Sequence, residues 1–88
     1  MKTEFKASFT QDLRRIKNKE LLQRLKVVIE TIEQSSNLDT IPNLKKLKGW
    51  SMYYRVRIGD YRMGLVVDAD VVTFVRFLHR KDIYRYFP

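Results

Sequence analysis

Residues 53–78 read YYRVRIGDYRMGLVVDADVVTFVRFL, and this stretch decides the fold. Its side chains alternate with the two-residue period of β-strands, and two short turn sequences, Gly59-Asp60 and residues 68–70, interrupt the alternation. Glycine at the first central position of a two-residue turn favours type II′, which joins antiparallel strands. The pattern predicts a three-stranded meander, with an almost wholly apolar third strand expected to be central, over residues 53–58, 61–68 and 71–78.

The same period sorts the charged side chains of the first two strands. Arg55 and Arg57 alternate with apolar Val56 and Ile58, and Arg62 follows the turn. If the apolar faces of the strands cover the rest of the chain, the three arginines share the exposed face. Holding like charges together costs free energy unless a polyanion neutralises them. We therefore expect this face to bind the phosphates of RNA.

The first half of the chain is expected to be helical. Residues 2–8 alternate weakly and predict a short strand, and Ser8 with Gln11 fits a capping box for a helix over about residues 9–16. A second helix is expected from about Asn18 to residues 35–37, because apolar side chains recur there at spacings of three and four. The sequence thus predicts an α+β fold in which a helical hairpin packs on a mainly antiparallel, twisted sheet.

Length and composition limit the function classes. The chain has 88 residues and no cysteine, so we expect a single domain over residues 1–88 with neither disulfides nor a thiolate metal site. No apolar run resembles a signal peptide or a membrane span, and the cytoplasm is the expected location, with no membrane partner.

The charge is strongly positive and unevenly distributed. The formal net charge is +8, and residues 45–88 hold ten basic and four acidic side chains. A surface that binds polyanions should therefore be built mainly by the second half of the chain. A basic surface that only aids solubility is the alternative, and charge alone also leaves DNA, an acidic protein or anionic lipid as partners.

Three motifs together resemble one protein family. The chain has KKLKG at residues 45–49, YRVRIGDYR at residues 54–62 and HRKDIY at residues 79–84. In combination, and over essentially the whole chain, they resemble the RelE/ParE superfamily of bacterial and archaeal type II toxins, in particular its RelE-like branch. The resemblance implies a βααβββ fold with a C-terminal helical tail, and a cognate antitoxin protein as partner.

The resemblance also separates two functions and implies a set of site residues. RelE-like toxins cut messenger RNA in the ribosomal A site, whereas ParE-like toxins inhibit DNA gyrase and generally lack the catalytic basic set. The two strand positions that are lysine in the best-known RelE type are both arginine here, which excludes proton transfer by them because arginine does not deprotonate. The catalytic residues implied by the resemblance are Arg55, Arg57, Arg62, Arg80 and Tyr84, with Tyr86 as a substitute for Tyr84.

The chemistry of RNA cleavage fits these residue types. Cleavage without a metal uses the neighbouring 2′-hydroxyl as nucleophile, so the enzyme must orient it, take its proton and stabilise charge on the phosphate. Arginine forks suit phosphate oxygens, and positive charge favours an ionised tyrosine. We expect no cofactor and no metal site, because the four acidic residues of the second half lie mainly in turns. Arg62 and Arg80 are expected to stabilise the transition state, and Tyr84 to act as base or stacking platform. Arg55 and Arg57 are expected to position RNA, and a share in charge stabilisation stays open for them.

Other side chains are candidates for RNA contact, each with a plainer alternative. His79 is a possible acid or base, or a histidine that ends a strand and bonds to the backbone. Trp50 and Tyr61 can stack on bases, but packing is the favoured interpretation, and the lysines can lie in a solvated loop. The expected RNA-binding residues are Lys45, Lys46, Lys48, His79, Lys81 and Tyr86.

The leading hypothesis is a toxin that cuts messenger RNA on the ribosome and stops translation, with ribosomal RNA as a further partner and no small-molecule cofactor. Two alternatives stay open. One is a ParE-like gyrase inhibitor without enzymatic activity, and the other is a catalytically weak RNA-binding member of the superfamily.

Overall fold

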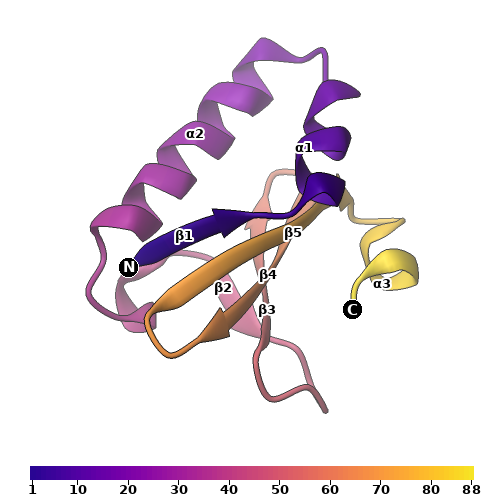
Figure 1. Ribbon diagram of the computed structural model, residues 1–88. Helices are drawn as coiled ribbons and strands as arrows, with labels where there is room; N and C mark the ends of the chain where they lie inside the picture. The colour runs from indigo at the N-terminus through magenta and orange to yellow at the C-terminus, as the bar shows by residue number, and fades with distance from the viewer.

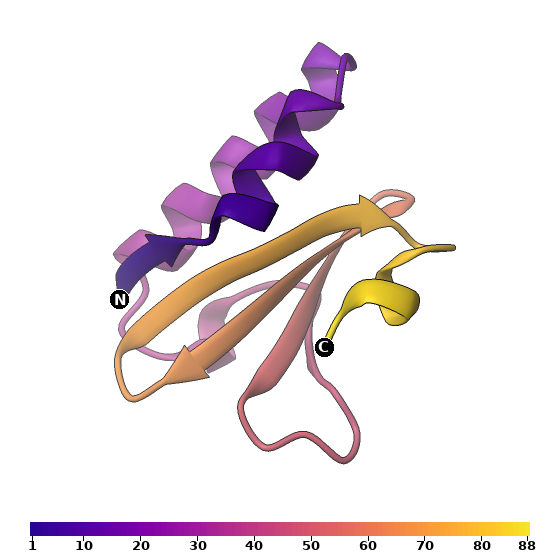
Figure 2. The same ribbon diagram turned by 45° about the vertical axis from the view of Figure 1, so that its right-hand side comes forward.

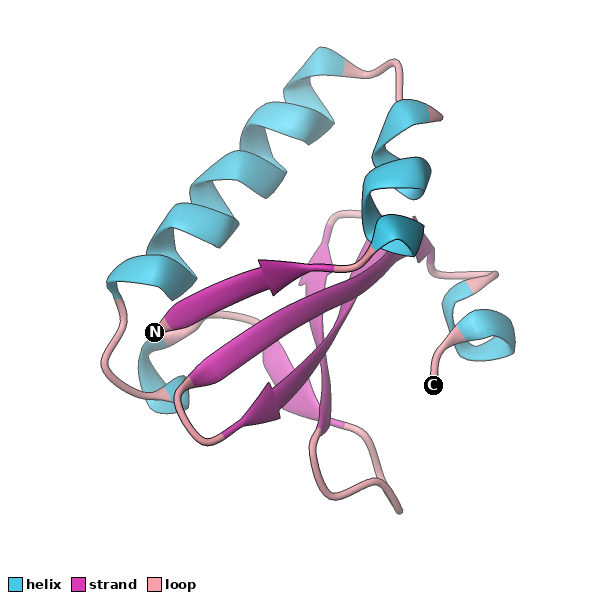
Figure 3. Ribbon diagram, viewed as in Figure 1, coloured by secondary structure: helices cyan, strands magenta, loops and turns pink.

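The computed structural model describes residues 1–88 and has the predicted α+β architecture (Figures 1 and 3). Five strands form one twisted sheet in the order β1-β5-β4-β3-β2, in which β1 runs parallel to β5 and all other neighbours are antiparallel. The elements are β1 (Lys2–Phe5), α1 (Ala7–Arg14), α2 (Lys19–Gln34), the 3-10 turn η1 (Leu38–Thr40), β2 (Leu44–Lys46), β3 (Tyr53–Ile58), β4 (Tyr61–Asp68), β5 (Val71–His79) and α3 (Ile83–Tyr86).

The helix α2 begins and ends where the sequence predicts. The side chain of Asn18 accepts a hydrogen bond from the backbone N–H of Leu21 at 3.1 Å, which satisfies one of the free donors of the first turn. Leu25 and Ile32 are buried against the sheet, and Ser35 ends the helix. Figure 2 shows α1 and α2 side by side on one face of the sheet. The predicted helical hairpin is confirmed.

The helix α1 corrects one sequence prediction. Lys6 is its N-cap residue and makes no side-chain cap, so the capping box of Ser8 and Gln11 is wrong, and the helix begins two residues earlier than predicted. Ser8 lies inside the helix and donates its hydroxyl proton to the carbonyl of Val75 in β5 at 2.6 Å. The strand β1 ends at Phe5, so this side chain satisfies a carbonyl on the edge of β5 that no strand pairs.

The hairpin β3–β4 has the predicted strands and turn. Gly59 has a φ of 59°, the sign that the first central residue of a type II′ turn requires. Val56 lies opposite Met63 and Ile58 opposite Tyr61 on the face that the helices cover. This face supplies most of the main hydrophobic core, together with Phe9 of α1 and the buried residues of α2 and β5.

The C-terminal segment packs on the other face of the sheet (Figure 2). Ile83 and Phe87 are fully buried in a second, smaller core with Leu47. The Phe87 ring covers Gly64 of β4 so closely that a Cβ at Gly64 would lie 2.7 Å from ring carbons. The C-terminal helical tail that the resemblance implies is confirmed as α3, and glycine at position 64 makes room for the Phe87 ring that anchors it.

Strand β2 was not predicted. Leu44–Lys46 forms an edge strand that pairs with β3, where the sequence predicts no strand. None of the helices is both long enough and apolar enough to span a bilayer.

Candidate functional site

Three arginines lie together on the face of the sheet that α1 and α2 leave open. The register of β3 and β4 places Arg57 directly opposite Arg62, and Arg55 directly opposite Gly64. Directly opposed residues of antiparallel strands point to the same side, with Cβ atoms about 4.5–5.5 Å apart. The predicted sharing of one face by the three arginines is confirmed.

Several charged groups surround Arg62 and shift its pKa. Burial lowers the pKa of the Arg62 guanidinium from its ordinary value, the charges of Arg55, Arg57 and Arg80 lower it further, and Tyr84 opposes this by raising it. Arginine remains protonated at neutral pH in proteins, so the charge persists. The other four residues of the expected catalytic set, Arg55, Arg57, Arg80 and Tyr84, are therefore all within electrostatic reach of Arg62. We call Arg55, Arg57, Arg62, Arg80 and Tyr84 the basic cluster.

The basic cluster has almost no counter-ion within the chain. The Nη1 atom of Arg62 donates to the carbonyls of Gly59 and Tyr61, both at 3.0 Å, instead of to a carboxylate. Arg80 has a contact of 3.9 Å with Asp60, but both side chains are well exposed. An exposed pair at that distance neutralises little charge. The cluster is therefore a site at which an anion from outside the chain would gain most.

The segment after β5 brings Arg80 and Tyr84 to the arginines of the hairpin. The backbone N–H of Arg80 donates to the carbonyl of Asp60 at 2.7 Å, which joins this segment to the β3–β4 turn. The buried side chains of Ile83 and Phe87 hold the segment on the sheet, while Tyr84 is 60% exposed. The Tyr84 side chain is consequently open to a ligand bound on the cluster.

The two C-terminal tyrosines have different neighbours. Tyr84 influences Arg62, whereas the ring centroid of Tyr86 lies 5.5 Å from the guanidinium carbon of Arg76 in β5. Tyr84 is thus the tyrosine placed in the basic cluster, and the predicted substitute Tyr86 contacts a different arginine.

His79 makes the backbone contact that the sequence allowed as an alternative. Its Nδ1 accepts a hydrogen bond from the backbone N–H of Lys81 at 3.2 Å, and its ring meets Tyr61 edge-on at 5.5 Å between centroids. A neutral ring with an accepting Nδ1 carries its proton on Nε2, which is then a donor. This arrangement favours a structural histidine over a general base.

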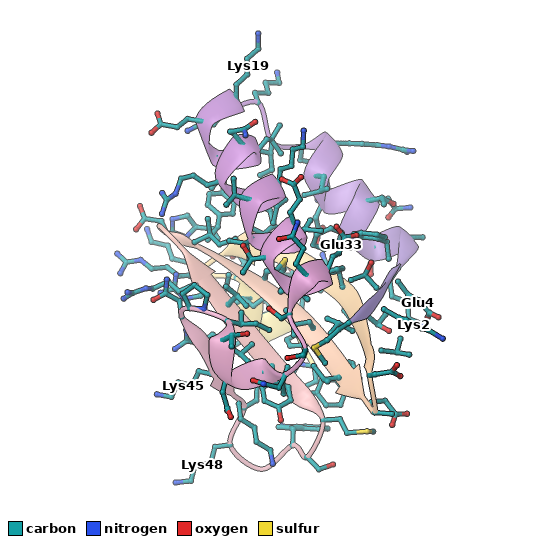
Figure 4. The ribbon with its side chains drawn as sticks, turned by 90° about the vertical axis from the view of Figure 1, so that its left-hand side faces the viewer. Lys2, Glu4, Lys19, Glu33, Lys45 and Lys48 are labelled. Carbon is teal, nitrogen blue, oxygen red and sulfur yellow. The ribbon has the colours of Figure 1, made fainter.

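The lysines extend the positive surface to the edge of the sheet. Lys45 lies directly opposite Arg55, so β2 continues the cationic face onto a third strand. A shallow recess of about 240 Å³ is lined by Asn43, Leu44, Lys45, Arg55 and Arg57. Figure 4 shows Lys45 and Lys48 projecting into solvent at one end of the molecule, while Lys19 projects at the other end.

The aromatic candidates divide as well. Tyr61 stacks on Phe77 with ring centroids 5.2 Å apart and packs against the main core, as predicted. Trp50 contacts Tyr53 but remains 51% exposed, so the packing interpretation holds for only part of its surface.

The sequence reasoning missed the buried ion pair of Asp12 and Arg76. Asp12 is 4% exposed, and Arg76 donates to both of its carboxylate oxygens, at 2.8 and 3.0 Å. The available signal was a charged residue in the middle of the apolar stretch that forms β5, because such a charge needs a partner. Among all 88 residues, no three or more His, Asp or Glu side chains come together as a possible metal site.

Comparisons with known proteins identify the family. The family model of the ParE toxin of the type II toxin–antitoxin system parDE matches residues 3–84. Toxin RelE3 of Methanocaldococcus jannaschii is 42% identical over 89 aligned positions, which span the whole of both chains.

The solved structures that are similar include two archaeal toxin–antitoxin complexes. The RelB–RelE antitoxin–toxin complex from Methanococcus jannaschii contains a chain that is 40% identical, with a TM-score of 0.83 over 97% of this chain and 99% of that one. The archaeal RelE–RelB complex from Pyrococcus horikoshii OT3 shares the fold, with 20% identity and a TM-score of 0.73 over 90% of this chain and 93% of that one. The chain therefore belongs to the RelE/ParE superfamily of type II toxin–antitoxin toxins, within its RelE-like branch.

Proposed function

We propose that this toxin is an endoribonuclease that cuts messenger RNA in the ribosomal A site without a metal ion, and so inhibits translation in the cytoplasm. The observation that carries the proposal is the basic cluster, in which four arginines and one exposed tyrosine meet on an open sheet face with almost no internal counter-ion. An RNA phosphate supplies the negative charge that this arrangement lacks.

In the proposed reaction, the 2′-oxygen of one nucleotide attacks the adjacent phosphorus and the 5′-oxygen of the next nucleotide leaves. The 2′-hydroxyl gives up its proton to a base, and the leaving oxygen gains one, so the products are a 2′,3′-cyclic phosphate and a 5′-hydroxyl. Arg62 and Arg80 stabilise the extra negative charge on the phosphate, because a guanidinium group stays protonated and donates paired hydrogen bonds to phosphate oxygens. Tyr84 serves as the base or as a platform on which a nucleotide base stacks.

The flanking residues would position the RNA. Arg55 and Arg57 line the shallow recess beside the cluster together with Lys45, and this recess has the size and charge to hold a neighbouring phosphate. Lys48 and Lys81 are exposed and would contact RNA phosphates further out. Lys46 is also exposed, but it lies opposite Tyr54 on the face that the helices cover, so it would reach RNA only around the edge of the sheet.

The ribosome is proposed as an essential partner. The basic cluster lies on an open surface beside a shallow recess, which offers few contacts to order a flexible RNA chain. A ribosome that already holds the messenger RNA removes most of that entropic cost. The second proposed partner is a cognate antitoxin, which is supported by the solved relatives, since these are antitoxin–toxin complexes.

Gyrase inhibition is the second candidate, because the matching family model is described as that of the ParE toxin. It needs no catalytic residues, so it would leave the gathering of Arg62, Arg80 and Tyr84 without a use.

The deciding experiment is cleavage of a defined messenger RNA by purified protein, with and without programmed ribosomes. We expect cuts only with ribosomes, and at least a hundred-fold slower cleavage by Arg80→Ala, because oxyanion-stabilising groups typically contribute about 10²–10³ in rate. Lys2→Ala is the matched control, since it removes the same charge from an exposed side chain of β1 that lies opposite Val71, at the end of β5 away from Arg80.

The same assay tests the metal requirement and the alternatives. Cleavage should survive excess EDTA; complete loss that magnesium restores, with the ribosomes shown to remain assembled, contradicts metal-independent chemistry. Inhibition of gyrase supercoiling without any RNA cleavage would favour the second candidate. Ribosome binding with neither activity would indicate a catalytically weak RNA-binding protein.

A further inference from the structure

Asp12 is the only charged residue among the buried side chains, and the proposed chemistry does not use it. It lies on α1 and faces β5. A buried carboxylate is costly unless it is paired and hydrogen-bonded, so its partners indicate what it is for.

Asp12 has two partners, and only one of them needs its charge. Its Oδ2 accepts a hydrogen bond from the backbone N–H of Phe77 at 2.9 Å, on the stretch of β5 that β1 does not reach. A neutral acceptor could satisfy that donor. The fork of Arg76 requires both oxygens and the negative charge, with Nε at 2.8 Å from Oδ2 and Nη2 at 3.0 Å from Oδ1. This hydrogen bonding to Asp12 raises the pKa of Arg76.

Arg76 is in turn placed beneath the C-terminal segment. The register puts it opposite Gly64, the residue that the Phe87 ring covers. Its guanidinium carbon lies 5.5 Å from the centroid of the Tyr86 ring, within the range of a cation–π contact. Two bonds to Asp12 fix the plane of the guanidinium group, so Tyr86 meets a cation of defined position and orientation.

The helix α3 needs such a contact, because a helix of four residues has no stability of its own. Ile83 and Phe87 hold it on the sheet, but apolar contacts are not directional. Residues two apart in a helix point about 200° apart around the axis, so a turn that presents Tyr86 to Arg76 presents Tyr84 to the opposite side. Tyr84 is the residue within electrostatic reach of Arg62.

We propose that Asp12 and Arg76 are positioning residues, which seat Tyr86 and thereby set the orientation of α3 so that Tyr84 lies in the basic cluster. In this proposal Tyr86 orients α3 through its contact with Arg76 and does not bind RNA. The consequence for activity rests on the proposed function, whereas the placement of Tyr84 does not.

The placement is tested without RNA, by ¹⁹F NMR of protein that carries 3-fluorotyrosine at its five tyrosines. Tyr84→Phe and Tyr86→Phe assign the two resonances. In Tyr86→Phe, which keeps the aromatic face, we expect the chemical shift of the Tyr84 resonance to be unchanged. In Tyr86→Leu, we expect it to move toward the chemical shift of Tyr84 in the urea-unfolded protein. It should also move in Arg76→Lys, because an ammonium group keeps the charge but not the planar fork.

The thermal unfolding midpoint of each variant shows that it is folded before its spectrum is compared. Tyr86 is more than half exposed, so Tyr86→Leu leaves the main core intact. A Tyr84 resonance that stays in place in either Tyr86→Leu or Arg76→Lys overturns the proposal, and would mean that Ile83 and Phe87 suffice to orient α3.

The activity arm separates this proposal from the proposed function. On programmed ribosomes we expect single-turnover cleavage by Tyr86→Leu to fall about ten- to a hundred-fold with unchanged half-saturation by ribosomes, and Tyr86→Phe to restore it, because misplacement of a reacting group lowers the rate of the chemical step. If no form of the protein cleaves RNA, the proposed function fails while the NMR result still decides the placement of Tyr84. If wild type cleaves and Tyr86→Leu cleaves equally well, the positioning role is overturned while the proposed function stands.

Discussion

Arg76 and Arg62 lie on neighbouring strands of one sheet, yet their surroundings are opposite. Arg76 has a carboxylate of its own chain in a two-bond fork, and this contact raises its pKa. Arg62 is partly desolvated beside Arg55, Arg57 and Arg80, and its pKa is lowered. Both residues are arginines in β-strands of the same sheet, so neither the residue type nor the secondary structure explains the difference in their pKa shifts. What distinguishes a structural arginine from one that waits for a ligand is whether folding supplies its counter-ion.

Arg76 therefore contributes to the free energy of unfolding, whereas Arg62 contributes to the free energy of binding an anion. The pair of Asp12 and Arg76 ties α1 to β5, so removing one partner leaves a buried charge and weakens the folded state. The basic cluster holds like charges together, so it works against folding until an anion binds. Substitutions in the two places should therefore change different quantities.

The largest expected effect on stability comes from Asp12→Ala. It leaves the Arg76 cation and the Phe77 N–H without their acceptor, and breaking a buried pair in this way typically costs about 3–5 kcal/mol. That is a large part of the about 5–15 kcal/mol by which small proteins are stable. Urea unfolding followed by circular dichroism measures the loss.

Two further variants sharpen this result. Asp12→Asn keeps an acceptor for Phe77 and should lose less stability than Asp12→Ala. Combining Asp12→Ala with Arg76→Met removes both charges, and should recover part of the loss, because the cost lies mainly in the unpaired cation. If Asp12→Ala changes the free energy of unfolding by under about 1 kcal/mol, the carboxylate does not have the structural role assigned to it.

Arg62→Ala should show the opposite profile. We expect ribosome-dependent cleavage to fall about 10²–10³-fold, since a group aimed at the transition-state charge is lost. The free energy of unfolding should change by no more than about 0.5 kcal/mol, because Arg62 bonds only to two backbone carbonyls, those of Gly59 and Tyr61, and its removal relieves repulsion. Single-turnover cleavage and urea unfolding of the same preparation measure both quantities. A variant that loses stability and activity together would place Arg62 in the same class as Arg76.

Features of the fold that depend on residues close together along the chain could be predicted from the sequence, and those that depend on residues far apart could not. The strands of the β3–β4 hairpin, its glycine turn and the start of α2 at Asn18 were predicted correctly, because alternation, turn residues and a cap are local signals. The register of a hairpin follows from its turn, so the shared face of Arg55, Arg57 and Arg62 was also predictable.

What failed depends on long-range contacts. Ser8 has the residue type and spacing of a cap, but its hydroxyl bonds to a carbonyl 67 positions away. Asp12 and Arg76 are 64 positions apart, and nothing near either residue identifies the other. The strand β2 has three residues, two of them lysines, and forms because β3 offers it an edge. For the same reason, the continuation of the cationic face to Lys45 was visible only once β2 was placed beside Arg55.

The smallest expected effect tests whether the cluster opposes folding. Arg57 lies directly opposite Arg62, so Arg57→Gln removes one of two facing cations and should stabilise the protein by about 0.2–0.5 kcal/mol in low salt, a small value because solvent screens exposed groups. The gain should vanish as salt approaches 1 M, where the Debye length falls to about 3 Å. Lys26→Gln on α2 makes the same change of charge away from the cluster, and should give no gain that depends on salt. Equal behaviour of the two variants in urea unfolding at both salt concentrations would mean that the arginines of the cluster do not repel one another measurably, and that burial alone lowers the pKa of Arg62.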